Sequence, residues 1–109
     1  MAYTEKEHQI KVNTFEDITI ALRTLYDAKN RDYGDSFGQS FQKWGLPMAC
    51  IRLGDKLNRL ESFAQKKDMH VSDESVEDTL RDMANYAIMT LVELQMAKNK
   101  MEGEQLCVK

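Results

Sequence analysis

Several residue types are scarce in this sequence of 109 residues, and each shortage argues against a class of protein. The two cysteines, Cys50 and Cys107, lie far apart without CxxC spacing, which suits a reducing cytoplasm better than a disulfide framework. No apolar run approaches the roughly 20 residues of a membrane span. The N-terminal residues 1–12 are polar and charged, unlike a signal peptide. We therefore expect a cytoplasmic protein, in the host cytoplasm if a phage encodes it, with no membrane contact.

A surplus of positive charge is also missing. The formal net charge is −3, whereas a nucleic-acid binder usually has a basic surface. Direct nucleic-acid binding is therefore not expected, although a few local cations can hold a nucleotide. His8 and His70 have no neighbours at zinc-ligand spacing, and the glycines lack the GK[ST] ending of a Walker loop. No Ser/His/Asp or Cys/His arrangement indicates nucleophilic catalysis.

Hydrophobic residues at helical spacing predict a first main helix from Thr14 to about Asn30. Thr14 is the expected N-cap, with Asp17 as its capping-box partner. The following segment, 31–46, interleaves glycines with aromatic residues and is longer than most connections, which is typical of functional loops. We expect short helical pieces within it, around residues 40–43.

Two further helices are predicted. The second begins at Pro47, which fits a first helical turn. Gly54 inside it suggests close helix packing or a ligand near the backbone. The third begins at Ser72 or Ser75 and continues to about Glu102, with Gly103 as its stop. A polar connection, residues 65–71, joins them.

These elements predict an all-α protein, a small bundle of three main helices with no strand. We expect one domain over residues 1–109, with an N-terminal extension at 1–12 and a C-terminal tail at 103–109. A chain of this size buries a limited fraction of its surface. A homo-oligomer, a dimer or larger, is therefore expected to cover the apolar faces that remain.

Asp78, Asp82 and Asn85 lie at spacings i, i+4 and i+7 on the third helix and so share one face. Two carboxylates one turn apart, followed by an amide oxygen, suit a hard cation such as Mg²⁺. The alternative is a solvent-exposed acidic face beside the helix N-terminus, and spacing alone favours this alternative.

Arg52, Asp55 and Arg59 share a face of the second helix in the same way. They either form intrahelical salt bridges, worth a few tenths of a kcal/mol each, or serve a ligand. In the second case Asp55 adds a ligand to the same metal, while the arginines bind phosphate oxygens.

In the glycine-rich segment, Lys29, Arg31, Tyr33 and Gly34 are candidates to reach a phosphate or to stack on a base. Its aromatic residues either plug the core over a helix pair or form a stacking platform. Both interpretations stay open for Tyr33, Phe37, Phe41 and Trp44.

Three blocks of residues, in order from about Lys29 to Met89, resemble the nucleotide modification associated domain 1 family, which is typical of bacteriophages and bacteria. The blocks are Lys29, Asp32, Tyr33, Gly34, Ser36 and Phe37, then Ile51, Arg52, Asp55, Lys56, Arg59 and Leu60, and then Asp78, Thr79, Leu80, Asp82, Ala84, Asn85, Tyr86 and Ala87. The resemblance implies a nucleotide ligand. The nucleotide-binding residues it implies are Lys29, Tyr33, Gly34, Arg52, Lys56, Arg59, Asn85 and Tyr86.

More distantly, the helix pair resembles the MazG-like, all-α nucleoside triphosphate pyrophosphohydrolases. Those enzymes hold Mg²⁺ against a nucleotide's phosphates with acidic motifs on two helices. On that resemblance Asp82 takes the aspartate position, whereas Thr79 stands where their glutamate would be. Asp78 is the adjacent residue that would substitute for it.

Three functional hypotheses follow. In the leading one, a pyrophosphohydrolase-like enzyme, Asp55, Asp78 and Asp82 are catalytic residues that hold Mg²⁺. Cations such as Arg52 and Lys29 then neutralise charge on the phosphates. The second hypothesis is a non-catalytic protein that sequesters a nucleotide, including a cyclic or modified signal of host defence, and the missing glutamate favours it. The third is a helical interaction module.

Overall fold

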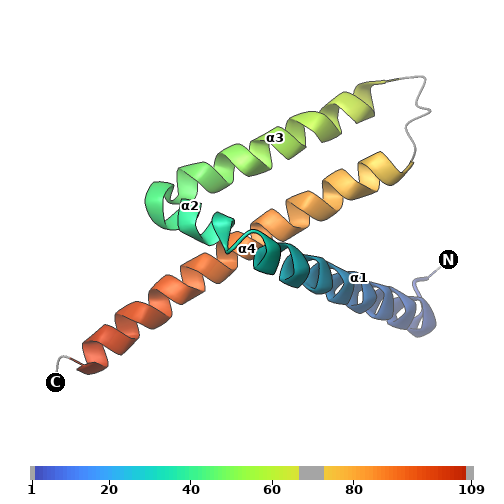
Figure 1. Cartoon of the computed structure of the whole chain (residues 1–109). Helices are drawn as coiled ribbons and strands as arrows, with labels where there is room; N and C mark the ends of the chain where they lie inside the picture. The colour runs from blue at the N-terminus through green and yellow to red at the C-terminus, as the bar shows by residue number, and fades with distance from the viewer. Residues whose placement is uncertain (1, 67–72, 108–109) are drawn as a thin grey trace. The chain divides into compact units, whose positions relative to one another are not determined.

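The computed structural model describes residues 2–66 and 73–107, and within these ranges it contains four α-helices and no strand (Figure 1). The helices are α1 (Glu5–Asp32), α2 (Ser36–Trp44), α3 (Leu46–Gln65) and α4 (Asp73–Cys107). The all-α prediction is confirmed. Contacts divide the chain into two compact units, Met1–Gly34 and Asp35–Lys109.

The first unit is essentially α1, which begins nine residues earlier than the predicted start at Thr14. Thr4 is its N-cap: the Thr4 hydroxyl accepts a hydrogen bond from the Glu7 amide at 3.0 Å, and the Glu7 carboxylate accepts one from the Thr4 amide at 2.8 Å. This complete capping box satisfies two amides that helix geometry leaves unpaired. Thr14 instead lies inside the helix, where its hydroxyl donates to the Ile10 carbonyl at 2.8 Å. The prediction of Thr14 as N-cap was therefore wrong, and residues 5–12 of the expected N-terminal extension belong to the helix.

A short turn ends α1. The Tyr33 amide donates to the Lys29 carbonyl at 3.0 Å, and the chain then adopts positive φ angles of 59° at both Gly34 and Asp35. Glycine meets this requirement without steric cost, and aspartate is one of the few other residues that tolerate it. Asp35 then serves as the N-cap position of α2, the helix that confirms the prediction of helical structure around residues 40–43.

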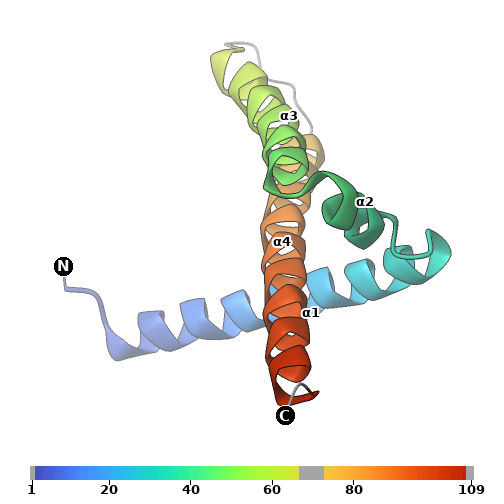
Figure 2. The ribbon, with the colours of Figure 1, turned by 90° about the vertical axis from the view of Figure 1, so that its left-hand side faces the viewer.

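Helices α2, α3 and α4 pack against one another in the second unit (Figure 2). Gly45, with φ of 69°, separates α2 from α3, and its amide donates to the Phe41 carbonyl at 2.7 Å. Pro47 lies in the first turn of α3, as predicted. α3 and α4 run antiparallel to each other as a hairpin, and α2 lies beside them.

The ends of α4 differ from the sequence prediction. The helix begins at Asp73, so Ser75 lies within it and is not its cap, while Ser72 and the connection 67–71 fall outside the described residues. Gly103 does not stop the helix, which continues to Cys107. One glycine in a helix interior costs only about 1 kcal/mol, and good helix formers flank this one.

The interior of the second unit consists of small side chains. Ala49 of α3 is fully buried, and Thr79 and Thr90 of α4 are nearly so. The Thr90 hydroxyl donates to the Tyr86 carbonyl at 2.7 Å, which satisfies it inside the helix. Small residues let helices approach closely, but they leave the larger apolar residues of α3 and α4 at the edges of the contact.

Gly54 has no such packing role. A Cβ atom built at Gly54 would meet nothing within 4 Å, so neither close helix packing nor a nearby element requires glycine there. We predict that Gly54→Ala stabilises the protein by about 1 kcal/mol through helix propensity alone. Thermal unfolding should show a rise in Tm of roughly 4–8 °C. An unchanged or lower Tm would mean that something else approaches this position.

Glu93 of α4 has a carboxyl group with a raised pKa. Partial burial, and secondarily the nearby Asp35 carboxylate, raise the pKa of the Glu93 carboxyl above its ordinary value. The folded state therefore binds this proton more tightly than the unfolded state, so its contribution to stability falls as the pH rises from about pH 4 through the raised pKa. We predict that Glu93→Gln raises the urea midpoint at pH 7 and has little effect at pH 4. Equal shifts at both pH values would contradict this assignment.

Candidate functional site

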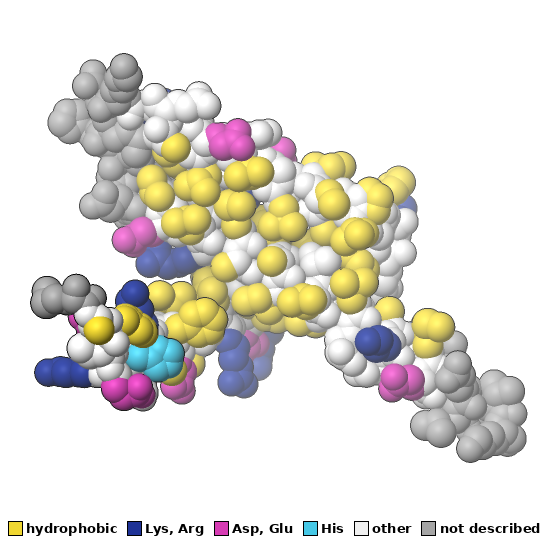
Figure 3. Space-filling view, turned by 180° about the vertical axis from the view of Figure 1, so that it is seen from behind, with side chains coloured by type: hydrophobic (Ala, Val, Ile, Leu, Met, Phe, Trp, Pro, Cys, Tyr) yellow, Lys and Arg dark blue, Asp and Glu magenta, His cyan; other side chains and the backbone are white. Residues whose placement is uncertain are grey.

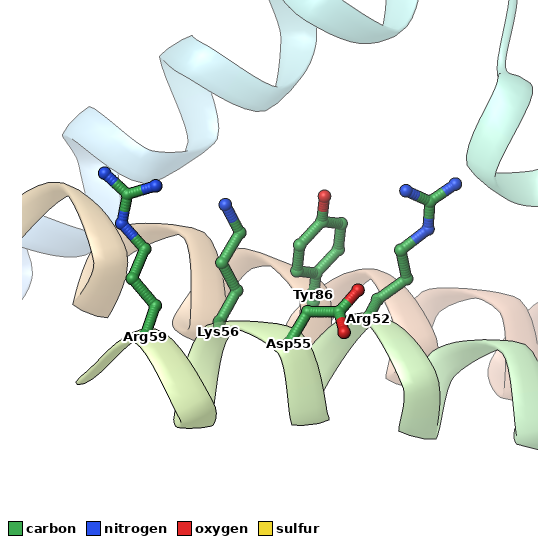
Figure 4. A pocket seen from close by; sticks show the side chains of 5 residues that line it. All are labelled: Arg52, Asp55, Lys56, Arg59 and Tyr86. Atoms are coloured by element: carbon green, nitrogen blue, oxygen red, sulfur yellow. The ribbon is translucent and has the colours of Figure 1, made fainter. Parts of the chain in front are cut away.

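A pocket of about 410 Å³ opens on the α3–α4 pair. Its lining side chains carry three positive charges, one carboxylate and one phenol. They are Arg52, Asp55, Lys56 and Arg59 of α3, and Tyr86 of α4 (Figure 4). We call this the α3–α4 pocket.

Helical spacing explains why four residues of α3 reach the same pocket. Arg52, Lys56 and Arg59 stand at i, i+4 and i+7, and Asp55 lies at i+3, so all four share one side of the helix. Figure 4 shows the four side chains rising from the same side of α3. The shared face predicted for Arg52, Asp55 and Arg59 is therefore present. Among these three described residues, none forms an ion pair with another, so the intrahelical salt-bridge interpretation is not realised.

One cation of the pocket is paired across the helices. Lys56 Nζ lies 2.9 Å from Asp82 Oδ2 of α4, and both side chains are partly buried. Partial burial strengthens such an attraction relative to a fully exposed pair. Asp82 thus neutralises Lys56, while Arg52 and Arg59 form no such pair among the described residues. The Arg59 guanidinium carbon lies 5.6 Å from the centre of the Phe63 ring, a cation–π contact that orients the side chain.

Tyr86 is held by the aromatic residues of α2. Its ring stacks on Phe37 with centroids 5.9 Å apart, and Phe37 stacks in turn on Phe41 at 6.5 Å. One face of the Tyr86 ring is therefore covered, while its hydroxyl points in the same direction as the side chains of α3 (Figure 4). Phe37 and Phe41 are packing residues. Tyr33 and Trp44, the other two aromatic residues of this segment, are exposed.

The three aspartates expected to hold a metal do not converge. Asp78 accepts a hydrogen bond from Arg81 at 3.3 Å in an exposed intrahelical pair, Asp82 pairs with Lys56, and Asp55 alone lines the pocket. Across the described ranges, no group of three or more His, Cys, Asp or Glu side chains is arranged to hold a metal ion. A pocket with three cations and one carboxylate does not fit a resident Mg²⁺, because that ion needs several oxygen ligands.

The side that Asp78 occupies explains this outcome. Thr79 is buried, whereas Asp78 is exposed beside it. Adjacent helical residues point about 100° apart, so Asp78 does not replace an acid at position 79.

The remaining predicted residues lie elsewhere. Asn85 is partly buried on α4, next to Tyr86. Lys29, Tyr33 and Gly34 belong to the first unit, at and just after the end of α1. Their assignment to nucleotide binding stays a prediction.

A family model described as nucleotide modification associated domain 1 matches residues 29–94 of the chain. This range covers more than half of the chain and includes all five lining residues. No curated protein and no solved structure matches the chain. In the part of the chain that the structure describes, no helix has the length and apolar character needed to cross a membrane.

Proposed function

Since the chain belongs to the nucleotide modification associated domain 1 family, we propose that its α3–α4 pocket binds a nucleotide through the phosphates. The observation that carries the proposal is the grouping of Arg52, Lys56 and Arg59 around one pocket in a chain of net negative charge. Such a local excess of cations favours a polyanionic ligand.

Each lining residue has a specific part in this proposal. The planar guanidinium groups of Arg52 and Arg59 suit phosphate oxygens, because they offer paired N–H donors. The two arginines are seven residues apart, or roughly 10 Å along the helix, which favours a chain of phosphates over a single one. The Tyr86 hydroxyl adds a neutral donor, and Phe37 fixes the ring that carries it.

Hydrolysis of the nucleotide is a second candidate, favoured by one observation: Asp55 lies in the same pocket as the cations. Mg²⁺ commonly binds one or two carboxylates together with substrate phosphates. In this version the ion enters with the nucleotide as part of the substrate, and Asp55 is the carboxylate that would contact it. Arg52 and Arg59 would bind the phosphates in the same way as in the non-catalytic version.

Asp55→Asn separates the two candidates. If the pocket only binds phosphates, removing the carboxylate that lies among its cations should raise nucleotide affinity several-fold. If Asp55 instead contacts an Mg²⁺ ion that enters with the nucleotide, pyrophosphate release should vanish in this variant. Calorimetric titration and a pyrophosphate assay on the same preparation measure both quantities.

The proposed function is tested most directly by calorimetric titration with several nucleoside triphosphates in EDTA. Because the cations belong to the protein, binding should occur without a divalent metal. A nucleotide at 100 times its Kd should also raise the free energy of unfolding by about 2.7 kcal/mol. If no nucleotide gives heat or thermal stabilisation, with or without Mg²⁺, the proposal is wrong.

A further inference from the structure

The ion pair between Lys56 and Asp82 differs from the other ion pairs among the described residues. The others lie within one helix, between residues three or four positions apart, and their side chains are 45–81% exposed. Lys56 and Asp82 instead join α3 to α4, and their side chains are only 27% and 37% exposed. Hydrophobic side chains gather over these two helices on the face that Figure 3 shows, so a charged pair between the helices needs an explanation. Partial burial reduces screening by water, which makes this attraction stronger than that of an exposed pair.

Asp82 lowers the positive charge that the α3–α4 pocket offers to a ligand. Lys56 is one of the three cations that line this pocket, and it stands four residues after Arg52 and three before Arg59. The two arginines form no ion pair among the described residues, whereas the Lys56 ammonium contacts the Asp82 carboxylate. A chain of phosphates that extends from one arginine to the other therefore passes a lysine that already has an anionic partner.

We propose that Asp82 regulates the α3–α4 pocket as an internal competitor, because its carboxylate occupies the Lys56 ammonium that a ligand phosphate would contact. The inference rests on the proposed function, since it concerns the same pocket and the same phosphate ligand. When the ligand binds, the ammonium exchanges a carboxylate oxygen for a phosphate oxygen, so the ligand gains only the difference between the two contacts. The Asp82 carboxylate also repels a phosphate near Lys56, since like charges at short range disfavour each other. Asp82 thus holds the affinity below what three unpaired cations would give.

Asp82→Asn tests the proposal, because asparagine has nearly the shape of aspartate and no charge. Calorimetric titration with inorganic triphosphate in EDTA should show binding about three- to ten-fold tighter than in the wild type, as expected for the loss of a partly buried competing charge. Circular dichroism checks that the variant keeps its helices. Glu77→Gln is the matched control: it removes one carboxylate from the same helix, and Glu77 pairs with the exposed Arg81 and does not line the pocket. Its affinity should stay within about two-fold of the wild type.

The nuclear magnetic resonance signal of the Lys56 ε-methylene supplies a measurement on the wild-type chain, in case Asp82→Asn alters the fold. In protein labelled at lysine, this signal is assigned by its loss in Lys56→Arg. It should shift when inorganic triphosphate is added, because the ammonium leaves one oxygen partner for another. The signal of Lys98, which is exposed on α4 and does not line the pocket, should stay in place. A Lys56 signal that does not move at saturating triphosphate would overturn the proposal.

The titrations also separate this inference from the proposed function. If the wild type binds triphosphate and Asp82→Asn binds it equally or more weakly, the competitor role of Asp82 is wrong, while the pocket remains a phosphate site. Equal gains in Asp82→Asn and Glu77→Gln would likewise contradict that role, because net charge alone would then explain them. If neither the wild type nor Asp82→Asn binds triphosphate, the proposed function fails and the inference fails with it.

Discussion

Replacing Arg52 and Arg59 together by alanine should weaken nucleoside triphosphate binding by about 100- to 10,000-fold. Each arginine is expected to make charge-assisted hydrogen bonds worth about 1.5–3 kcal/mol, and every 1.4 kcal/mol is a factor of ten in Kd. Neither side chain forms an ion pair among the described residues, so their loss leaves no carboxylate of the protein unpaired. The variant should therefore keep its fold, and calorimetric titration measures the change.

A double variant with the same loss of charge provides the control. Arg23 is exposed on α1, and Arg81 pairs with Glu77 and Asp78 on an exposed side of α4. Exposed pairs such as those of Arg81 contribute at most about 1 kcal/mol, and neither arginine lines the pocket. Arg23→Ala with Arg81→Ala should therefore bind nucleotide within about three-fold of the wild type. Equal losses in the two double variants would show that only net charge matters.

Helix α3 could be predicted because the signal for its start and the spacing of its polar residues agree. Arg52, Asp55 and Arg59 repeat at helical spacing after Pro47, so a correct helix start places them on one side. The ion pair of Lys56 could not be predicted from spacing alone, because its partner Asp82 lies on another helix. Pairings between helices depend on how the helices pack, which one sequence does not specify.

The ends of the helices and the orientation of α4 were harder to predict. Thr14 was predicted as the N-cap of α1, whereas Thr4 has the complete capping box with Glu7. On α4, Asp78 and Asp82 share a face by spacing, but α3 covers the side of Thr79 and Asp82 and leaves Asp78 in water. Whether polar residues at the boundary of an apolar helix face become buried or stay exposed depends on how the neighbouring helix packs.

Removing the phosphates from the ligand should reduce affinity far more than changing the base. Four of the five lining side chains are charged, and the fifth, Tyr86, has one ring face covered by Phe37 at 5.9 Å. A nucleoside loses its contacts with Arg52 and Arg59, which form no ion pair among the described residues, and each contact is worth about 1.5–3 kcal/mol. We therefore expect the nucleoside to bind at least 100-fold more weakly than its triphosphate.

Exchange of the base, by contrast, should change Kd by less than about five-fold, because base discrimination requires buried polar groups that pair with the base edge. Competition of a labelled nucleoside triphosphate by inorganic triphosphate gives the sharpest measurement, since this competitor carries the phosphates alone. It should displace the nucleotide with a similar Kd. A strong preference for one base would show that groups beyond the α3–α4 pocket contact the base. Failure of inorganic triphosphate to compete would show that the cations of α3 do not dominate recognition.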